Sequence, residues 1–388
     1  MLHKIFTAVI GLVICFQQTD LFAQDKKEFT IRVTHNAKKA QRKKIVSIEW
    51  QQILKNYPSI DTTNFKIIDW SSKKEVMYQL AYFGNKVPQQ LLLEVDLIPG
   101  QIGQYNIIAA PHTPFVSKTY ARYVPERKDD FAWENDKIAF RVYGKALEGT
   151  NENANGIDVW VKRTDQLVIN KRYGLKDYHT DNGDGLDYYH VGLTLGAGNI
   201  APFINDSIYF PKNYQNWEVL DNGPLRTTFK LTYAPWNVAG DLVSMTKTIS
   251  IDAGSQLSKI AIHLSTISRD SLPVVVGIIK RPGETNHYFN QANGIMAYWE
   301  PTDPKFGTTG VGCIFPNTVK AMLNTKEHFL TKFTIKTNSN FSYYTGAAWD
   351  RANEITNAKD WYAYLNDYKN KLNTKVNVVI DHLNKTNK

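Results

Sequence analysis

The sequence is poor in cysteine and, beyond its first two dozen residues, has no long apolar run. Only two of its 388 residues are cysteines, Cys15 and Cys313. Because Cys15 lies in a segment that export would remove, the mature chain would hold one cysteine and no internal disulfide. No later stretch is apolar enough to span a membrane. These absences exclude a small disulfide-stapled scaffold and predict no stable membrane insertion.

Several common catalytic motifs are also absent. The sequence has no GxSxG nucleophile motif and no glycine-rich phosphate loop, and Cys313 in "GVGCIFP" is interpreted as a buried core thiol. It has no HxxxH pair for zinc, and the acidic residues near position 184 do not have the spacing of a calcium loop. We therefore predict no cofactor, while two nearby histidines and a carboxylate leave a divalent metal such as calcium or zinc open.

The first 24 residues, "MLHKIFTAVIGLVICFQQTDLFAQ", have the layout of a secretory signal peptide. Lys4 precedes an apolar stretch, and the small residue Ala23 lies near its end. We therefore expect residues 1–24 to be cleaved and the protein to be exported, either to the periplasm or out of the cell.

The charge balance is basic. Lysine and arginine number 46 against 37 aspartate and glutamate residues, a formal net charge of +9. For an exported protein this favours an acidic glycan as partner and predicts no nucleic acid. The densest positive run, "KKAQRKK" at residues 38–44, is interpreted as a solvated loop between two strands.

The rest of the chain predicts two all-β domains. Short alternating runs such as "FTIRVTH" and "LLLEVDLIPG" indicate a small N-terminal β-sandwich over residues 25–115. "APHTPFVSK" holds two prolines and is the candidate linker. The many strands that follow, with few helices, predict a large antiparallel double sheet over residues 116–388.

Two segments give finer expectations. In "KIAFRVYG", alternation places Ile138, Phe140 and Val142 toward the core and Arg141 on the other face. One helix is expected near the C-terminus, where Thr356 is a possible cap and apolar residues recur at spacings of three to four.

The segment "YHTDNGDGLDYYHVG" combines turn formers with histidines and tyrosines. If Asp184-Gly185 is a two-residue hairpin turn, His179 lies directly opposite His190. If Asn182-Gly183 is the turn instead, His179 faces Leu186 and the pairing of the two imidazoles is lost. The alternative is that this hairpin is purely structural, with its Tyr and Asp side chains bonded only to the backbone.

A second candidate is "YVPERKDDFAWENDKIAFRVYG", which places aromatic residues between charges. Trp133 could stack on a sugar ring, while Arg127 or Arg141 could hold a carboxylate with two hydrogen bonds. Further weak candidates follow in the chain. The predicted substrate-binding residues are Arg127, Trp133, Glu134, Asn135, Arg141, Arg163, Arg281 and Trp349.

Five motifs together resemble one family of exported bacterial proteins with a domain of unknown function. They are "PERKDDFAWENDKIAFRVYG", "GIDVWVKR", "DNGDGLDYYHVG", "VLDNGPLRTTFKLTYAPW" and "TKTISIDAGSQLSKI". The resemblance covers residues 28–385 and implies a galactose-mutarotase-like supersandwich for the large domain. The chain is similar to the ulvan-oligosaccharide dehydratases of marine bacteria. It would then remove water across carbons 4 and 5 of a uronic acid at the non-reducing end.

Such an elimination needs a cation at the carboxylate, a base for the carbon-5 proton and an acid for the departing hydroxyl. We hypothesise His190 or Tyr189 as the base and His179 or Tyr188 as the acid. Because alternation separates Tyr189 from its two neighbours, we favour the face of Tyr188, His190 and His179. Arg127, Arg163 or Arg281 would hold the carboxylate.

Three alternatives stay open at this point. A polysaccharide lyase would use the same groups but expel a sugar. A glycoside hydrolase would need two carboxylates, for which Glu134 and Asp187 are candidates. A non-catalytic protein that binds acidic glycans would use the same surface without chemistry.

Overall fold

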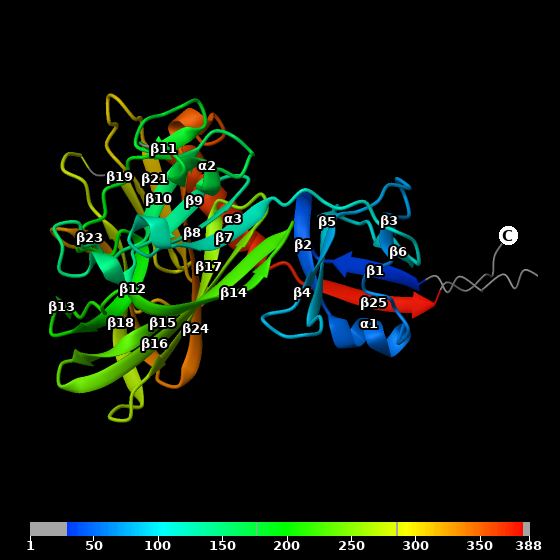
Figure 1. The fold of residues 1–388 in the computed structure, drawn as a ribbon, viewed down its shortest axis with the longest axis horizontal. Helices are drawn as coiled ribbons and strands as arrows, with labels where there is room; N and C mark the ends of the chain where they lie inside the picture. Colours follow the sequence, from blue (N-terminus) through cyan, green and yellow to red (C-terminus); the bar gives the residue numbers. More distant parts are fainter. Residues whose placement is uncertain (1–28, 176, 285, 383–388) are drawn as a thin grey trace, which may run out of the picture.

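The computed structural model describes residues 29–175, 177–284 and 286–382, and it confirms the all-β prediction (Figure 1). A small β-sandwich is followed by three larger antiparallel sheets with few helices. The predicted signal peptide, residues 1–24, lies outside the described residues. No helix in the described part of the chain is long and apolar enough to span a membrane.

The small sandwich consists of two sheets and one helix. The first sheet has the order β25-β1-β6-β3 and the second β2-β5-β4. The alternating residues Phe29, Ile31 and Val33 of β1 are buried, which explains why this segment forms a strand that covers a core. The elements are β1 (Phe29–His35), β2 (Gln41–Glu49), α1 (Trp50–Asn56), β3 (Lys66–Asp69), β4 (Tyr78–Ala81), β5 (Gln90–Leu97), β6 (Gly103–Ile108) and β25 (Val376–His382).

The large domain holds sheets of five, five and eight strands, in the orders β11-β10-β9-β8-β7, β13-β12-β18-β23-β22 and β14-β15-β16-β17-β24-β21-β20-β19. The first sheet consists of β7 (Thr119–Val124), β8 (Asp130–Asn135), β9 (Ala139–Val142), β10 (Asp158–Lys162) and β11 (Gly185–Asp187). The second consists of β12 (Ala197–Ile204), β13 (Ser207–Ile208), β18 (Ser271–Ile279), β22 (Ala321–Asn324) and β23 (His328–Lys336). The third consists of β14 (Tyr214–Asn222), β15 (Arg226–Val238), β16 (Asp241–Asp252), β17 (Leu257–Ser265), β19 (Asn286–Asn290), β20 (Ile295–Trp299), β21 (Thr309–Ile314) and β24 (Ser339–Trp349).

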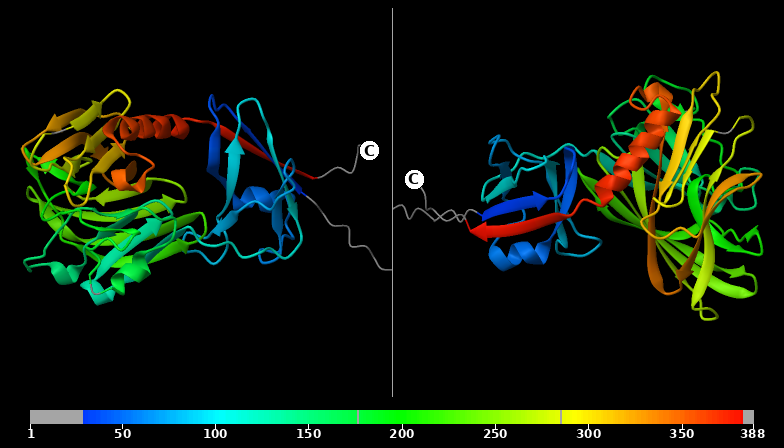
Figure 2. Two further views of the ribbon diagram at one scale, coloured as in Figure 1. Left: turned by 90° about the horizontal axis from the view of Figure 1, so that it is seen from above. Right: turned by 180° about the vertical axis from the view of Figure 1, so that it is seen from behind.

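The C-terminal strand crosses between the two domains. Figure 2 shows the chain leaving α3 (Ala358–Leu372) on the large domain and running back to the small sandwich, where β25 pairs antiparallel with β1. The predicted domain boundary at residue 116 assigned all later residues to the large domain and therefore did not include the pairing of β25 with the small sandwich. Only pairing in space joins β1 to β25, and no local pattern in the sequence carries that information.

The predicted helix exists, but its cap is Asn357 and not Thr356. The side chain of Asn357 accepts a hydrogen bond from the backbone N–H of Asp360 at 3.0 Å, which satisfies a free donor of the first turn. Trp361 and Leu365 are fully buried against the large domain. The predicted apolar spacing therefore identified the face that α3 buries.

The sheet from β7 to β11 has one apolar and one polar face. Ile138, Phe140 and Val142 are buried in the main core, as predicted. The other face carries charged side chains that α2 (Ile169–Tyr173) and the loop after it cover. This covered polar face forms the candidate site.

Candidate functional site

The loop that leads into β11 is not the predicted Asp184-Gly185 hairpin. Gly185 already belongs to β11 and pairs with Lys162 of β10. The Asp181 carboxylate accepts the backbone N–H groups of Gly183 at 2.9 Å and Gly185 at 3.1 Å, so the chain forms a wider, side-chain-capped loop.

This loop changes which residues face each other. The backbone N–H of Asp187 donates to the carbonyl of Tyr178 at 3.1 Å. These two residues are equidistant from Asn182-Gly183, so this is the pairing that the alternative turn predicts. The prediction that His179 lies opposite His190 is therefore wrong. His179 lies beside Asp187 instead.

Arg141 of β9 lies at the centre of a buried ionic cluster. Its guanidinium contacts Asp158 at 2.6 Å, Asp187 at 2.9 Å and Asp130 at 3.4 Å. The three carboxylates come from β8, β10 and β11, and β9 brings Arg141 between them through its pairing with Asp158. Arg141 is only 5% exposed, so it cannot hold a substrate carboxylate directly and that prediction is wrong.

The cluster holds more negative than positive charge away from water. Burial raises the pKa of Asp130 to about 6, although Arg141 acts to lower it. Burial also raises the pKa of Asp158 and of Asp187, again against the effect of Arg141. Three carboxylates around one guanidinium cannot all be neutralised, so this cluster can retain protons near neutral pH.

Tyr178 connects this cluster to the surface. Its hydroxyl accepts a hydrogen bond from Nε of Arg127 at 2.9 Å and another from Nη1 of Arg141 at 3.3 Å. Arg127 is also bonded to Glu152 at 2.9 Å, and its Nη1 is buried without a hydrogen-bond partner. The side chain of Arg127 is 26% exposed, and its role in substrate binding stays a prediction.

His179 follows Tyr178 and is exposed. Its Nδ1 lies 2.9 Å from the carbonyl oxygen of Asp187 and 3.7 Å from the Oδ2 of the same residue. Because a carbonyl only accepts, a neutral His179 carries its proton on Nδ1 and leaves a lone pair on Nε2. The rings of Tyr178 and His179 are 4.5 Å apart between centroids. An acceptor and a hydroxyl donor are therefore presented side by side.

The other predicted catalytic residues lie further along the chain, outside this pair. Tyr189 is 3% exposed, with the Arg281 guanidinium 4.3 Å from its ring, so the prediction of Tyr189 as a base that contacts substrate is wrong. Tyr188 is partly buried and shares a hydrogen bond of 2.6 Å with Thr309. The side chain of His190 is exposed, and its carbonyl accepts from Arg281 at 2.6 Å.

Arg281 and Arg163, two predicted carboxylate ligands, each form an ion pair within the protein. Arg281 pairs with Glu300 at 2.9 Å, and burial raises the pKa of Glu300 to about 7. Arg163 pairs with Asp181, and its guanidinium lies 5.2 Å from the centroid of the Trp349 ring. Arg163 therefore fixes the loop that carries His179.

Two predicted sugar platforms are buried. Trp133 is 0% exposed and donates from Nε1 to Ser258 at 3.0 Å. Trp349 is 2% exposed and donates to the carbonyl of Phe306 at 2.8 Å. Neither can present a ring face to a sugar, and their prediction as platforms is wrong. β8 turns Trp133 toward the core because the apolar face of its sheet lies there.

Glu134 has a structural role. Its carboxylate accepts from the backbone N–H groups of Val168 and Ile169 and from the ammonium of Lys162, all within 2.8 Å. It is 0% exposed, so the predictions of Glu134 as a sugar ligand and as one of two hydrolytic carboxylates are wrong.

Asn135 is also structural. Its amide donates to the backbone carbonyls of Asp252 at 2.6 Å and Ser255 at 2.7 Å. Asn135 is 0% exposed, and its prediction as a sugar ligand is wrong.

The sequence interpretation missed Tyr178 and the carboxylates Asp130 and Asp158. Asp158 stands in "GIDVWVKR" between two apolar residues, and a charge inside such a strand signals a buried pair. Tyr178 carried no distinguishing signal, because its role depends on two arginines distant in sequence. Among the described residues, no group of three or more His, Cys, Asp or Glu side chains could hold a metal ion.

Sequence comparisons match this chain to one protein family and to a relative from a bacterium. The model of a domain of unknown function, DUF4861, matches residues 33–378. Uncharacterized protein P7 of Formosa agariphila is 32% identical over 316 residues, which are 75% of this chain and 78% of that protein.

Solved structures match more distantly. A glycosyl hydrolase family 38 protein of Enterococcus faecalis has a TM-score of 0.49 at 10% identity, covering 92% of this chain and 48% of its own. An alpha-mannosidase of Enterococcus faecalis V583 has a TM-score of 0.47 at 9% identity, covering 90% and 46%. The chain spans about half the length of these structures, and at such scores neither likeness carries an argument about activity. By the match of its sequence over residues 33–378, the chain belongs to the DUF4861 family.

Proposed function

We propose that the protein is an exported, carbohydrate-active dehydratase that acts in the periplasm or outside the cell. It removes water across carbons 4 and 5 of a non-reducing-end uronic acid in ulvan-type acidic oligosaccharides and leaves an unsaturated uronic acid. Support comes from the resemblance of the five sequence motifs and from the acid–base pair at the edge of the Arg141 cluster.

One observation carries the proposal. The Tyr178 hydroxyl accepts from two guanidinium groups, those of Arg127 and Arg141, while its neighbour His179 is held through Nδ1. With both acceptor positions of Tyr178 occupied, its own hydrogen is free to be donated, and two positive charges stabilise the phenolate that remains.

The groups then divide the elimination between them. Nε2 of His179 takes the proton from carbon 5, and the electrons of that C–H bond form the C4=C5 double bond. The C4–O bond breaks as Tyr178 donates its proton, and the hydroxyl leaves as water. Arg127 holds the substrate carboxylate and stabilises negative charge that develops next to carbon 5.

The Arg141 cluster would return the enzyme to its starting state. After turnover, His179 carries an extra proton and Tyr178 lacks one. Asp187 contacts both Arg141 and His179, and burial raises its pKa to about 6. The extra proton of His179 passes to this carboxylate and a proton from the cluster or from water returns to Tyr178, so both groups recover their starting states.

The test is an incubation of the protein with ulvan oligosaccharides that end in a saturated uronic acid. Growth of the ultraviolet absorbance of a conjugated enol-acid, with loss of one water in the mass spectrum and no shortening of the chain, is expected. Absorbance growth with chain shortening would identify a polysaccharide lyase that uses the same groups. Tight binding without either change would identify a glycan-binding protein.

A further inference from the structure

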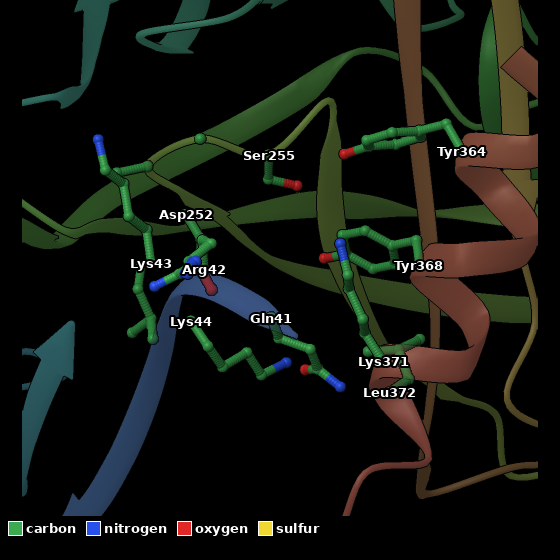
Figure 3. A pocket seen from close by; sticks show the side chains of 13 residues that line it. Gln41, Arg42, Lys43, Lys44, Asp252, Ser255, Tyr364, Tyr368, Lys371 and Leu372 are labelled. Carbon is green, nitrogen blue, oxygen red and sulfur yellow. The ribbon is translucent and has the colours of Figure 1, made fainter. Parts of the chain in front are cut away.

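A groove separates the two domains, and it shares no residue with the Arg141 cluster. It consists of two adjoining cavities of about 420 and 140 Å³, both bordered by Lys44, Asp252 and Tyr368. Figure 3 shows β2 of the small sandwich on one side and the tyrosines of α3 on the other. The larger cavity falls within the roughly 300–1,000 Å³ typical of ligand sites.

The interdomain groove is strongly basic. Six cationic side chains and one carboxylate, Asp252, line its two cavities. The cationic residues are Arg42, Lys43, Lys44, Arg226, Lys259 and Lys371. Part of the run interpreted as a solvated loop contributes here, because Arg42 and Lys44 lie in β2 and border the groove.

The cations are not balanced within the protein. Arg226 pairs with Asp252, Arg42 with Asp96 and Lys371 with Asp367. The ammonium groups of Lys43, Lys44 and Lys259 have no ion pair or hydrogen bond in the described part of the chain.

Lys44 lies among other charged side chains of the groove. Burial lowers the pKa of Lys44, with Lys371 and Arg226 acting in the same direction and Asp252 opposing them. A cation kept in a half-buried position among other cations is stabilised by a bound anion.

A second observation also points to a ligand. Thr228 is 3% exposed and borders the larger cavity, and its hydroxyl has no hydrogen-bond partner. A buried hydroxyl without a partner costs free energy, so its retention here favours a ligand that supplies one. Thr248 and Ser250 border the same cavity with further hydroxyl groups.

The walls of the larger cavity offer flat apolar surface as well. Phe83, Tyr344 and Tyr368 border it, and the rings of Tyr344 and Tyr368 contact each other edge to face at 5.7 Å. Rings beside hydroxyls and cations form the combination that suits a sugar with an acidic group.

We propose that the interdomain groove is a binding site for an acidic saccharide of one or two rings, distinct from the proposed catalytic site. Lys44 and Lys259 hold its acidic groups, Thr228 accepts or donates one hydrogen bond, and the tyrosines contact the ring faces. The groove binds the saccharide without a chemical reaction. This proposal depends only on the residues of the groove and is independent of the proposed catalytic activity.

The test is calorimetric titration of the full chain with digalacturonic acid at low ionic strength, with cellobiose and sodium sulfate as comparison probes. Hydrogen exchange of Gln41–Glu49 with and without digalacturonic acid locates the binding. We expect slower exchange in this segment, and weaker binding by roughly ten-fold in each of Lys44→Met, Lys259→Met and Thr228→Val.

Lys336→Met is the matched control, because Lys336 is exposed on β23 and lies outside the groove. It should bind digalacturonic acid as the unmodified protein does. Equal affinity in Lys259→Met, whose exposed side chain can be removed without unfolding, would overturn the proposal. If Lys336→Met weakens binding of digalacturonic acid as much as the groove variants do, the loss of affinity comes from the lower net charge and the proposed site is wrong. Sulfate bound as tightly as the disaccharide would overturn the assignment to a saccharide.

Discussion

Nδ1 of His179 lies 2.9 Å from the backbone carbonyl oxygen of Asp187. This contact holds an exposed imidazole against a strand whose own side chain, the Asp187 carboxylate, is paired with Arg141. The ring is thus fixed at one nitrogen and open at the other. A histidine held in this way can accept a proton without losing its position, which a freely rotating surface histidine cannot do.

Replacement of His179 should therefore separate activity from stability. In His179→Ala we expect turnover of the saturated oligosaccharide to fall by roughly 10² to 10⁴, the usual contribution of a general base. The melting temperature should change little, because the side chain is 60% exposed. Initial rates and thermal unfolding of the same preparation measure both.

Two histidine variants complete this experiment. His263→Ala is the matched control, because His263 is exposed on β17 and makes no contact with the site. His190→Ala tests the sequence-based hypothesis. Loss of turnover in His190→Ala together with full activity in His179→Ala would overturn the assignment of the base.

Tyr178→Phe removes the proposed acid but keeps the ring. We expect kcat to fall by roughly 10² to 10⁴ while substrate affinity stays nearly constant, since Arg127 remains. A fall in kcat at nearly constant KM marks a group that acts only in the transition state, which a merely structural role would not produce. Tyr82→Phe is a control distant in sequence, and an unchanged kcat in Tyr178→Phe would contradict the proposal.

The sequence predicted the strands and their buried faces well, because period-two alternation is a local property. Ile138, Phe140 and Val142 were placed correctly from eight residues of pattern. The loop before β11 was placed wrongly because Asp181 accepts two backbone N–H groups, and this side-chain cap outweighed the preference of Asp-Gly for a tight turn.

The candidate site was predictable only in part. Its segments were identified, and His179 and Arg127 were among the residues named. Trp133 and Glu134 were misassigned because a tryptophan or glutamate in a charged stretch has the same sequence signature whether it faces solvent or a buried partner. Arg141 lies where four strands meet, and their order in the sheet is not a local property of the sequence.

The buried carboxyl groups make the free energy of unfolding dependent on pH. Glu300 allows the contribution of a single such group to be measured. Burial raises its pKa from 4.5 to about 7. The folded protein therefore retains a proton that the unfolded chain releases, so folding stability falls as the pH rises from about 4.5 to about 7. The contribution of Glu300 is on the order of 3 kcal/mol.

Glu300→Gln should remove this part of the pH dependence. The free energy of unfolding, measured with urea at pH 5 and pH 8, should differ less between the two pH values in Glu300→Gln than in the unmodified protein. Glu327→Gln makes the same change at an exposed position and should keep the original difference. An identical pH profile for Glu300→Gln would contradict the raised pKa.

Two adjacent residues of β25 test whether the C-terminal strand completes the small sandwich. Ile380 is 6% exposed and belongs to the core of that domain, while Val379 is 41% exposed on the opposite face of the same strand. Ile380→Ala should lower the free energy of unfolding by about 2 to 4 kcal/mol through lost burial and a cavity. Val379→Ala, on the exposed face, should lower it by less than about 1 kcal/mol.

Hydrogen exchange of the amides of β1 at increasing urea reports on this domain, because β1 pairs with β25 in the same sheet. Equal losses in the two variants would show that β25 does not cover the sandwich with the Ile380 face. A large loss in Ile380→Ala alone would establish that the last strand stabilises the first. Because β25 follows α3, which packs on the large domain, the same strand would then tie the two domains together and hold the walls of the interdomain groove at a fixed separation.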